Sequence, residues 1–441
     1  MGKNLLTPGE KIRKIRRSFN IIQSDLTDGK ITRNLISLIE NNRAELKEST
    51  AKIIADSINR ICKERNIDFT VTPHDLLMNN TMQADKMLDD LIILVNNNSN
   101  NKHYDFSPVI NEAEKLIKHN PDLKKIIDFY LDLGDSFILR NDYWQAYVFY
   151  FKAYEHLDFK KQPIYIARTT IELSYCCNIL AKFSETVQII NPVLSLNIKI
   201  PPVYKYKLIL NKALAQKNLK EYMNSINSLH ELDNIKLDNT HYFNVKILEA
   251  NCYRDLGDFN NSLDIYYELY NEKYCNDSTK YLTVLCNIID TYVNMNEPDK
   301  LRVFLNEAMN ILKQPSLEIN NHYSFPIYHD IENAALHMKS YDDAIIVLTK
   351  KLKEARESKR FDLQFDSLNN LFLIYLHKKE YNKLEYLKPY LMDLLNNDNK
   401  KEYHTLIYKY ISMYSMQNKK EHIDSLVSYA LNLNKKIGYA K

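Results

Sequence analysis

The chain has 441 residues, of which 45% are hydrophobic and 26% are charged, and its net charge is +3. It contains only six glycines, which argues against a β-rich fold or an enzyme built on glycine-rich loops. The basic excess is local, because residues 1–66 hold 14 Lys or Arg and 8 Asp or Glu, a net charge of +6. A basic segment of this kind favours contact with nucleic acid, where neutralised phosphates release counterions.

The first predicted helix starts after Thr7, a good N-cap residue, with Pro8 at the first helical position. Basic side chains lie around the apolar Ile12 and Ile15 of this helix: Lys11, Arg13, Lys14, Arg16 and Arg17. A later helix is expected over residues 49–64. Its inward-facing residues are Ile53, Ile54, Ser57, Ile58 and Ile61.

Residues 23–40 read QSDLTDGKITRNLISLIE and predict two short helices joined by a tight turn. Residues 23–27 form the first of them, with Leu26 as its inward anchor. Gly29 supplies the turn, because a residue without Cβ adopts positive φ at little cost. Thr32 is a good N-cap, so the second helix is expected to start there.

This second helix has one buried side and one exposed side. Ile36 and Ile39 lie three residues apart and are expected to face inward, which leaves Arg33, Asn34 and Ser37 facing outward. Arg and Asn pair bidentately with guanine and adenine edges, so Arg33 and Asn34 are the candidate base-reading residues. The residues expected to hold phosphates are Gln23, Thr32 and Arg43.

The segment resembles the Cro/repressor-type (XRE) helix-turn-helix family. The matching positions are Gln23, Leu26, Gly29, Ile31, Thr32, Ile36, Ser37, Ile39 and Glu40. The turn is shorter than the family's usual one, and Asn42 replaces its usual Gly, a mild change since Asn tolerates the left-handed conformation. The resemblance implies double-stranded operator DNA as a partner, and a structural pair between Glu40 and an Arg of the first helix, for which Arg16 fits best. The alternative is a small helical bundle that makes no DNA contact.

Residues 69–119 are expected to connect this DNA-binding domain, residues 1–68, to the remainder of the chain. Thr72-Pro73 starts a predicted helix that runs to about residue 95, and the NNNSNN at 96–101 is a loop. A second helix covers about residues 107–119. Because the apolar residues keep helical spacing, we expect a connecting helix and an irregular hairpin, not a flexible linker.

Residues 120–441 are self-similar. Two clear copies, YLDLGDSFILRNDYWQAYVFYFKA and ANCYRDLGDFNNSLDIYYEL, lie around residues 134 and 257 and resemble the tetratricopeptide repeat, a helical hairpin. The expected turn residues recur every 37 to 43 residues: Asn141, Ala181, Asn218, Gly257, Asn296, Lys339, Lys379 and Asn418. Most turns are followed by an aromatic ring expected to pack between the two helices of its hairpin: Tyr143, Phe183, Phe259, Tyr341 and Tyr381.

The predicted fold class is therefore all-α, an N-terminal helix-turn-helix domain followed by a right-handed superhelix of tetratricopeptide-like helical hairpins. The six cysteines show no CxxC spacing and follow no signal peptide, so we expect buried thiols in a reducing cytosol. The sequence contains no HExxH, no P-loop, no GxSxG, and no apolar run near the ~18 residues that a membrane span needs. We expect a cytoplasmic protein, not an enzyme, with no catalytic residues, metal, cofactor or membrane contact.

A short-turn XRE motif followed by long, degenerate tetratricopeptide repeats resembles the RRNPP family. These are cytoplasmic quorum-sensing regulators of Gram-positive bacteria that respond to small imported signalling peptides. The resemblance implies a homodimer whose repeat domain binds a short peptide and controls two DNA-binding heads. One branch of the family instead binds and dephosphorylates a response regulator, and Arg33, Asn34 and Ser37 argue against that branch. A repeat-based interaction scaffold is the third possibility.

An extended peptide needs partners for its N–H and C=O groups, and Asn can serve both. In a tetratricopeptide hairpin the first helix lines the groove, at positions three and six residues before the turn and one turn further back. Asn251 and Arg254 are expected to anchor the peptide, and Arg254 favours an acidic or free carboxylate end. The alternative is that these are ordinary exposed Asn of an Asn-rich chain. The predicted groove residues are Asn178, Asn244, Asn251, Arg254, Asp290, His329, Asn333, Asn369 and Tyr408.

Overall fold

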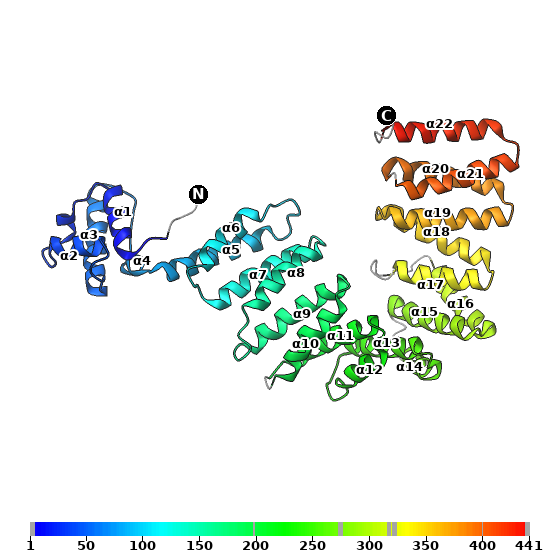
Figure 1. Ribbon diagram of the computed structural model, residues 1–441, viewed down its shortest axis with the longest axis horizontal. Coiled ribbons are helices and arrows are strands. Elements are labelled where there is room, and N and C mark those ends of the chain that lie inside the picture. The colour runs from blue at the N-terminus through cyan, green and yellow to red at the C-terminus, as the bar shows by residue number, and fades with distance from the viewer. Residues whose placement is uncertain are drawn as a thin grey trace. The chain divides into compact units, whose positions relative to one another are not determined.

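The computed structural model of the protein, shown in Figure 1, describes residues 5–196, 199–271, 277–314, 319, 324–398 and 400–436. Every regular element within these residues is a helix, which confirms the all-α class. The chain divides into two compact units, Met1–Lys236 and Leu237–Lys441. The right-handed superhelix expected for the whole array stays a prediction.

The first unit begins with a small helical domain, here called the head. It comprises α1 (Pro8–Ser18), the 3-10 helix η1 (Gln23–Leu26), α2 (Arg33–Glu40) and α3 (Glu48–Glu64). The element expected over residues 23–27 is thus a single 3-10 turn, whereas the helix expected over 49–64 is confirmed as α3. The head has its own core, whose fully buried members include Ile12, Leu26, Ile36, Ile54 and Ile58.

The helix caps and turns of the head form as the sequence predicts. The Thr7 hydroxyl accepts a hydrogen bond from the backbone N–H of Glu10 and caps α1. The Thr32 hydroxyl accepts one from the N–H of Leu35 and caps α2. Gly29 has φ +68° in the turn before α2, and Asn42 has φ +56° after it. Both residues occupy the left-handed conformation that their types tolerate best.

The connecting segment differs from the prediction of one helix reaching residue 95. It forms α4 (Pro73–Leu77) and α5 (Asn80–Asn98), followed by α6 (Ser107–Ile117). Helix α4 ends because Met78 leaves the helical region, with φ −53° and ψ 115°. The Asn79 side chain then accepts from the N–H of Met82 at 2.8 Å and caps a new helix. Asn side chains favour such caps over helix interiors, so Asn79 explains the break.

The remaining helices pair as hairpins, and in each hairpin we call the first helix A and the second B. In the first unit the pairs are α7 (Leu123–Ile138) with α8 (Tyr143–Glu155), α9 (Pro163–Ile179) with α10 (Phe183–Ser195), and α11 (Pro202–Asn218) with α12 (Tyr222–His230). In the second unit they are α13 (Asn239–Asp255) with α14 (Phe259–Asn271), α15 (Ser278–Met295) with α16 (Pro298–Leu312), α17 (Ser324–His337) with α18 (Tyr341–Glu357), α19 (Phe361–His377) with α20 (Tyr381–Asn397), and α21 (His404–Met416) with α22 (Lys420–Lys436). Most A helices have 16 to 18 residues, in keeping with the long repeat interval.

All eight A-to-B turns share one geometry. A residue with positive φ ends each A helix, and the next N–H donates to the carbonyl five residues back, as from Asp142 to Phe137 and from Lys182 to Cys177. This is the pattern of a Schellman cap. Seven predicted turn residues are confirmed, but the third turn falls at Lys220 (φ +64°) instead of Asn218, which is the last residue of α11.

Most B helices begin with an aromatic residue, among them α8 with Tyr143 and α18 with Tyr341. Tyr143 lies edge-on to Tyr175 of α9, and Tyr341 contacts His377 of α19. Each ring therefore reaches the A helix of the following hairpin. These contacts link successive hairpins, and the expectation that each ring packs between the two helices of its own hairpin stays a prediction.

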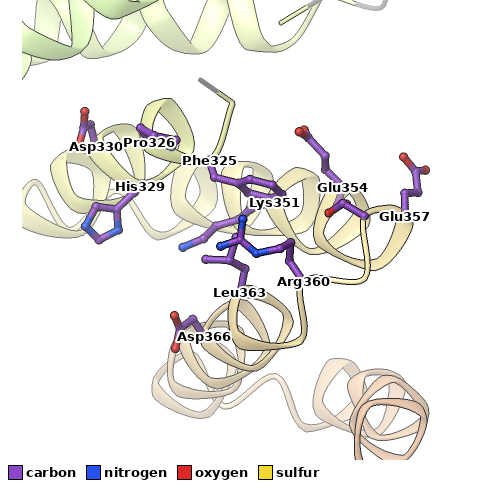
Figure 2. A pocket seen from close by; sticks show the side chains of 11 residues that line it. Phe325, Pro326, His329, Asp330, Lys351, Glu354, Glu357, Arg360, Leu363 and Asp366 are labelled. Atoms are coloured by element: carbon purple, nitrogen blue, oxygen red, sulfur yellow. The ribbon is translucent and has the colours of Figure 1, made fainter. Parts of the chain in front are cut away.

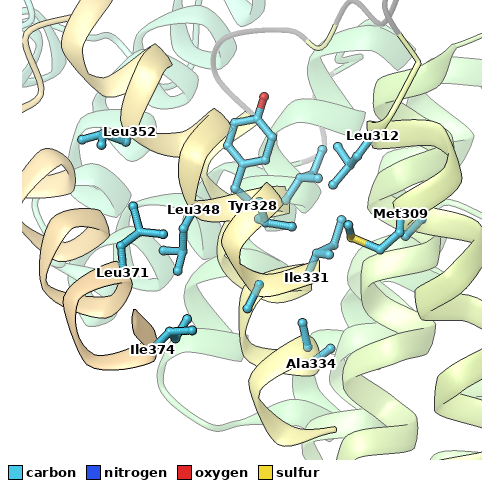
Figure 3. Packing of buried hydrophobic residues seen from close by; sticks show 14 of the residues in the cluster. Met309, Leu312, Tyr328, Ile331, Ala334, Leu348, Leu352, Leu371 and Ile374 are labelled. Atoms are coloured by element: carbon cyan, nitrogen blue, oxygen red, sulfur yellow. The ribbon is translucent and has the colours of Figure 1, made fainter. Parts of the chain in front are cut away.

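Apolar side chains fill the space between successive hairpins. Figure 3 shows this in the second unit, where Met309, Leu312 and Ile331 meet on one side of α17, and Leu348 and Leu371 meet on the other. All five are almost fully buried. The first unit has a separate core that runs from α5 to α11.

Gly134 of α7 lies against the ring of Tyr150 of α8. A Cβ atom at this position would lie 2.3 Å from Cε1 of Tyr150. That ring is 1% exposed and its hydroxyl donates to Asp135 at 2.6 Å, so it has little freedom to move away.

We therefore expect Gly134→Ala to destabilise the α7–α8 hairpin by about 1–3 kcal/mol, the usual cost of overpacking. Hydrogen exchange measured by mass spectrometry should show faster exchange in both helices. Glu155→Ala, at an exposed position of α8, is the control and should leave exchange unchanged. Wild-type exchange in Gly134→Ala would contradict the close contact.

Candidate functional site

The first turn of α2 presents the two predicted base-reading residues to solvent. Arg33 and Asn34 are exposed, and Ser37 is half-buried one turn later. The opposite side of the helix is held in the core by Ile36 and Ile39, at 0% and 2% exposure. The helix can therefore offer Arg33 and Asn34 to a ligand without losing its packing.

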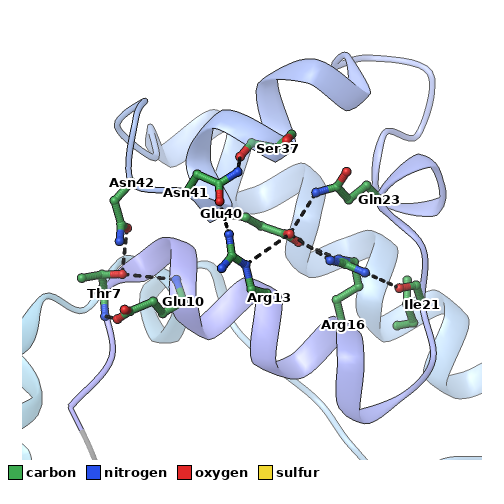
Figure 4. Close-up of polar contacts among 10 residues, drawn as sticks. All are labelled: Thr7, Glu10, Arg13, Arg16, Ile21, Gln23, Ser37, Glu40, Asn41 and Asn42. Atoms are coloured by element: carbon green, nitrogen blue, oxygen red, sulfur yellow. Dashed lines mark hydrogen bonds and ion pairs between the residues drawn. The ribbon is translucent and has the colours of Figure 1, made fainter.

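Glu40 at the end of α2 fixes the orientation of that helix. Its carboxylate is 2% exposed and accepts from Arg16 Nε at 2.6 Å and from Arg16 Nη2 at 2.9 Å, so the predicted pair forms and its geometry is bidentate. Gln23 Nε2 donates to the same carboxylate at 2.9 Å, and Arg13 lies 3.8 Å away. Figure 4 shows α1, η1 and α2 converging on this one group.

The electrostatics of the pair follow from this arrangement. Burial alone would raise the pKa of Glu40, but the hydrogen bonds from Arg16 and Gln23, with the charges of Arg16 and Arg13, lower it below its ordinary value. The hydrogen bond to Glu40 raises the pKa of Arg16. Both groups are therefore held in their charged forms, as a buried ion pair requires.

The three residues predicted to contact phosphate have different roles in the structure. Arg43 is exposed just after α2. The hydroxyl of Thr32 caps the helix, and the side-chain amide of Gln23 binds Glu40. Gln23 therefore has a structural role, and a phosphate contact by Gln23, Thr32 or Arg43 stays a prediction.

One basic residue of α1 has a structural role that its sequence position did not reveal. Lys11 Nζ donates to the carbonyls of Asp75 at 2.7 Å and Met78 at 2.8 Å, at the end of α4. Burial lowers the pKa of this amine to about 8. Gln83 of α5 also bonds both the N–H and the C=O of Leu6. These contacts tie the head to the connecting helices.

In the second unit, Arg254 is committed to other side chains. Its guanidinium is 15% exposed and lies 2.9 Å from Asp290 and 3.1 Å from Asp255. It also donates to Asn287 at 3.1 Å. Two carboxylates therefore neutralise the charge that was expected to attract an acidic peptide end.

Several other predicted groove residues also have partners within the fold. Asn251 accepts from the hydroxyl of Tyr266 at 2.5 Å. Asn178, which lies in the first unit, donates to the carbonyl of Asn211 at 3.0 Å. Asn369 accepts from Lys409 at 2.6 Å. We expect truncation of these residues to destabilise the hairpins, because each removes a contact within the fold.

The remaining predicted groove residues lie on the A helices of the second unit. Asn333 is exposed and shares a 3.1 Å hydrogen bond with His329, Tyr408 is 66% exposed, and Asn244 is also exposed. His329 lines a cleft of about 980 Å³ formed by α17, α18 and α19, which Figure 2 shows from close by. Among the predicted residues only His329 belongs to this cleft lining.

The sequence reasoning missed the other side chains of the cleft. They are Phe325, Pro326, Asp330, Lys351, Glu354, Glu357, Ser358, Arg360, Leu363 and Asp366. One signal could have found part of the set, because an Asp recurs at about one repeat interval on three successive A helices, at 290, 330 and 366. The contribution of α18, a B helix, could not be found by considering A helices alone.

Other expected features concern thiols, metals and membranes. Cys62, Cys176, Cys177 and Cys286 are buried free thiols, Cys252 is buried, and Cys275 lies outside the described residues. Within the described ranges, no cluster of three or more His, Cys, Asp or Glu could hold a metal ion. None of the helices described has the length and apolar character needed to cross a bilayer.

Comparison with known proteins gave matches among solved structures alone. Neither a protein-family model nor a curated protein sequence matches the chain. The apo form of the quorum sensor NprR from B. thuringiensis is similar at 16% identity and TM-score 0.43, over 79% of this chain and 99% of that one. NprR in complex with its cognate peptide NprX gives 15% identity and TM-score 0.38, over 80% and 99%. The apo form of RapI gives 11% identity and TM-score 0.42, over 95% and 99%.

These TM-scores lie below 0.5. At this level of similarity, only the residues and contacts of the chain itself bear on its function.

Proposed function

We propose that the protein is a peptide-controlled transcription regulator of the RRNPP type, in which a helix-turn-helix head (residues 1–68) binds operator DNA. A connecting segment (69–119) joins the head to a repeat domain (120–441) that takes a short signalling peptide. The observation that carries the proposal is the orientation of α2 in the head. Its outward side bears Arg33 and Asn34, and its inward side is fixed by the buried Glu40.

Charge and rigidity support DNA as the ligand of the head. The head carries the chain's basic excess, and neutralising phosphates is rewarded by counterion release. A base-reading side chain also needs a rigid support, because a misplaced bidentate contact loses its specificity. The convergence of Arg16, Gln23 and Arg13 on Glu40 supplies that support.

The repeat domain supplies the features a peptide site requires. The cleft between α17 and α19 is large enough for several residues of a peptide and has both apolar and charged side chains. Through Lys11 and Gln83 the head is fastened to α4 and α5, and α5 packs on α7. A ligand that favours one arrangement of the hairpins would in this way bias the placement of the head.

Assembly and location complete the proposal. One head can contact only a few base pairs, so useful specificity requires a homodimer on two half-sites. The buried thiols fit a reducing compartment, the cytoplasm.

Selection from a random pool of double-stranded DNA tests the proposal. The full-length protein is expected to enrich one sequence composed of two related half-sites, and affinity for it should fall steeply as salt rises. Light scattering on the selected complex should give two chains per DNA. Retention of DNA with no enriched sequence would contradict specific reading. No DNA binding at all would favour the response-regulator antagonist or the scaffold.

A further inference from the structure

The cleft of Figure 2 has an apolar floor and a charged rim. Phe325 of α17 and Leu363 of α19 lie in its middle. His329 and Asp330 of α17 and Asp366 of α19 lie toward one end in Figure 2, and Glu354 and Glu357 of α18 lie toward the other. A chain of several residues could therefore contact the apolar floor and meet carboxylates at both ends.

The cations of the cleft are already neutralised by neighbouring carboxylates. Lys351 is 4% exposed and lies 2.9 Å from Glu332, a carboxylate that also accepts from Asn370. Arg360 lies 3.3 Å from Asp362. Neither Glu332 nor Asp362 belongs to the cleft lining. Lys351 therefore leaves little attraction for an acidic ligand, whereas Arg360, whose side chain is 53% exposed, is matched by one carboxylate outside the lining.

The carboxylates of the lining lack such compensation. Neither Asp330 nor Asp366 forms an ion pair with any residue in the described part of the chain, and the same holds for Glu354 and Glu357. Glu354 accepts a hydrogen bond from the hydroxyl of Ser324, which carries no charge. Apart from Lys351 and Arg360, which have carboxylate partners outside the lining, the lining holds four carboxylates. They are Asp330, Glu354, Glu357 and Asp366.

The titration of the two Asp residues agrees with this excess. Burial, followed by the charge of Asp290, raises the pKa of Asp330 to about 6. Burial also raises the pKa of Asp366. A raised carboxyl pKa means that the ionised form is under-stabilised in the free protein, and a cation placed beside it would relieve that cost.

We propose that this cleft binds the positively charged part of the peptide, a Lys or Arg side chain or a free amino terminus, through Asp330, Asp366 and the Glu354–Glu357 rim. The inference rests on the proposed peptide-binding function and replaces the acidic ligand end expected from Arg254. Phe325 offers an apolar surface for the aliphatic stem of such a side chain, beside Arg360, whose guanidinium lies 5.7 Å from the centre of the ring.

The test uses the full-length protein and a random heptapeptide mixture, prepared once with free amino termini and once acetylated. Peptides retained after size-exclusion separation are identified by mass spectrometry. The wild type should enrich Lys and Arg over Asp and Glu by roughly tenfold, as a charge-assisted contact gives. If Lys and Arg are enriched from the acetylated mixture too, the cation is a side chain. If the free mixture is retained without that enrichment and acetylation abolishes retention, the cation is the amino terminus.

Asp330→Asn with Asp366→Asn is the decisive variant. It keeps side-chain volume, and because the folded state raises both pKa values, removing these charges should not weaken folding at pH 7. The charge-matched control is Asp342→Asn with Asp424→Asn, at exposed positions outside the cleft. We expect the cationic enrichment to be lost in the first double variant and kept in the second.

The outcomes separate this inference from the proposed function. Peptides retained equally from both mixtures without a preference for Lys or Arg, or with a preference that survives Asp330→Asn and Asp366→Asn, would overturn the cationic cleft and leave peptide binding in place. Retention of no peptide from either mixture would overturn peptide binding itself.

Discussion

Replacing Arg33 and Asn34 together by Ala is expected to reduce affinity for the selected DNA site by about two orders of magnitude. Each side chain is proposed to contact a base edge, and one such bidentate contact contributes about 1–3 kcal/mol of discrimination. Sequence preference should relax at the positions these residues read, whereas the salt dependence, set by phosphate contacts, should change little. Fluorescence anisotropy with the selected site and with scrambled DNA measures both effects.

The control for this variant is Arg302→Ala with Asn306→Ala. These two residues are exposed on α16 of the second unit, so the same chemical groups are removed from a helix outside the head. Arg43→Ala gives a second comparison, since loss of a phosphate contact should weaken binding to all sequences alike. Wild-type affinity and specificity in the Arg33, Asn34 double variant would end the proposal that α2 reads bases.

Glu40→Ala is expected to destabilise the head by about 3–5 kcal/mol, the usual cost of removing one partner from a buried ion pair. The side chain is 2% exposed, and its loss leaves Arg16 buried at 15% side-chain exposure without its carboxylate. Hydrogen exchange should accelerate across α1 and α2, and DNA binding should fall as a consequence. Glu45→Ala, an exposed Glu of the same head, should leave exchange unchanged. Slow exchange in Glu40→Ala would show that the core alone holds α2.

The lowered pKa of Glu40 makes the stability of the head depend on pH. Because the pKa of Glu40 is lower in the folded protein than its ordinary value, its contribution is fully present above that ordinary value, about 4.3. The contribution is lost as the pH falls through the lower folded value. The protection factors of the α2 amides, which correct for slower intrinsic exchange at acid pH, should therefore fall below about pH 4. In Glu40→Gln this dependence should be absent, and an unchanged pH profile would assign the effect to other carboxylates.

Local signals in the sequence were sufficient to determine much of this architecture. Thr7 and Thr32 cap their helices because each hydroxyl can reach an N–H three residues on. The residue types at Asn141, Gly257 and Asn296 tolerate the left-handed turn that ends an A helix. Arg16 and Glu40 could be paired because the family resemblance fixes which residue of α1 faces the end of α2. In all these cases the physical cause lies within one helix, one turn or one recognised motif.

At positions where two local conformations are both favourable, the sequence did not determine which of them forms. Asn79 can sit within a helix or cap one, and the structure adopts the cap and breaks the predicted helix. Asn218 and Lys220 can both end α11, although Asn is the residue type that better tolerates positive φ. Lys220 takes that position, which lets Tyr222 begin α12 like the ring at the start of most other B helices. Packing between helices decides such cases, because it outweighs the small differences in local preference.

The charge of the cleft was decided by tertiary structure alone. The sequence predicts that Arg254 binds an anionic group of the peptide. In the structure Asp255 and Asp290 neutralise its charge, and Asp290 belongs to another hairpin. The uncompensated carboxylates come from α17, α18 and α19 and meet only when those helices pack. A sequence determines which charges are present. Which of them remain available to a ligand depends on the distances between helices, because an ion pair forms only within a few ångströms.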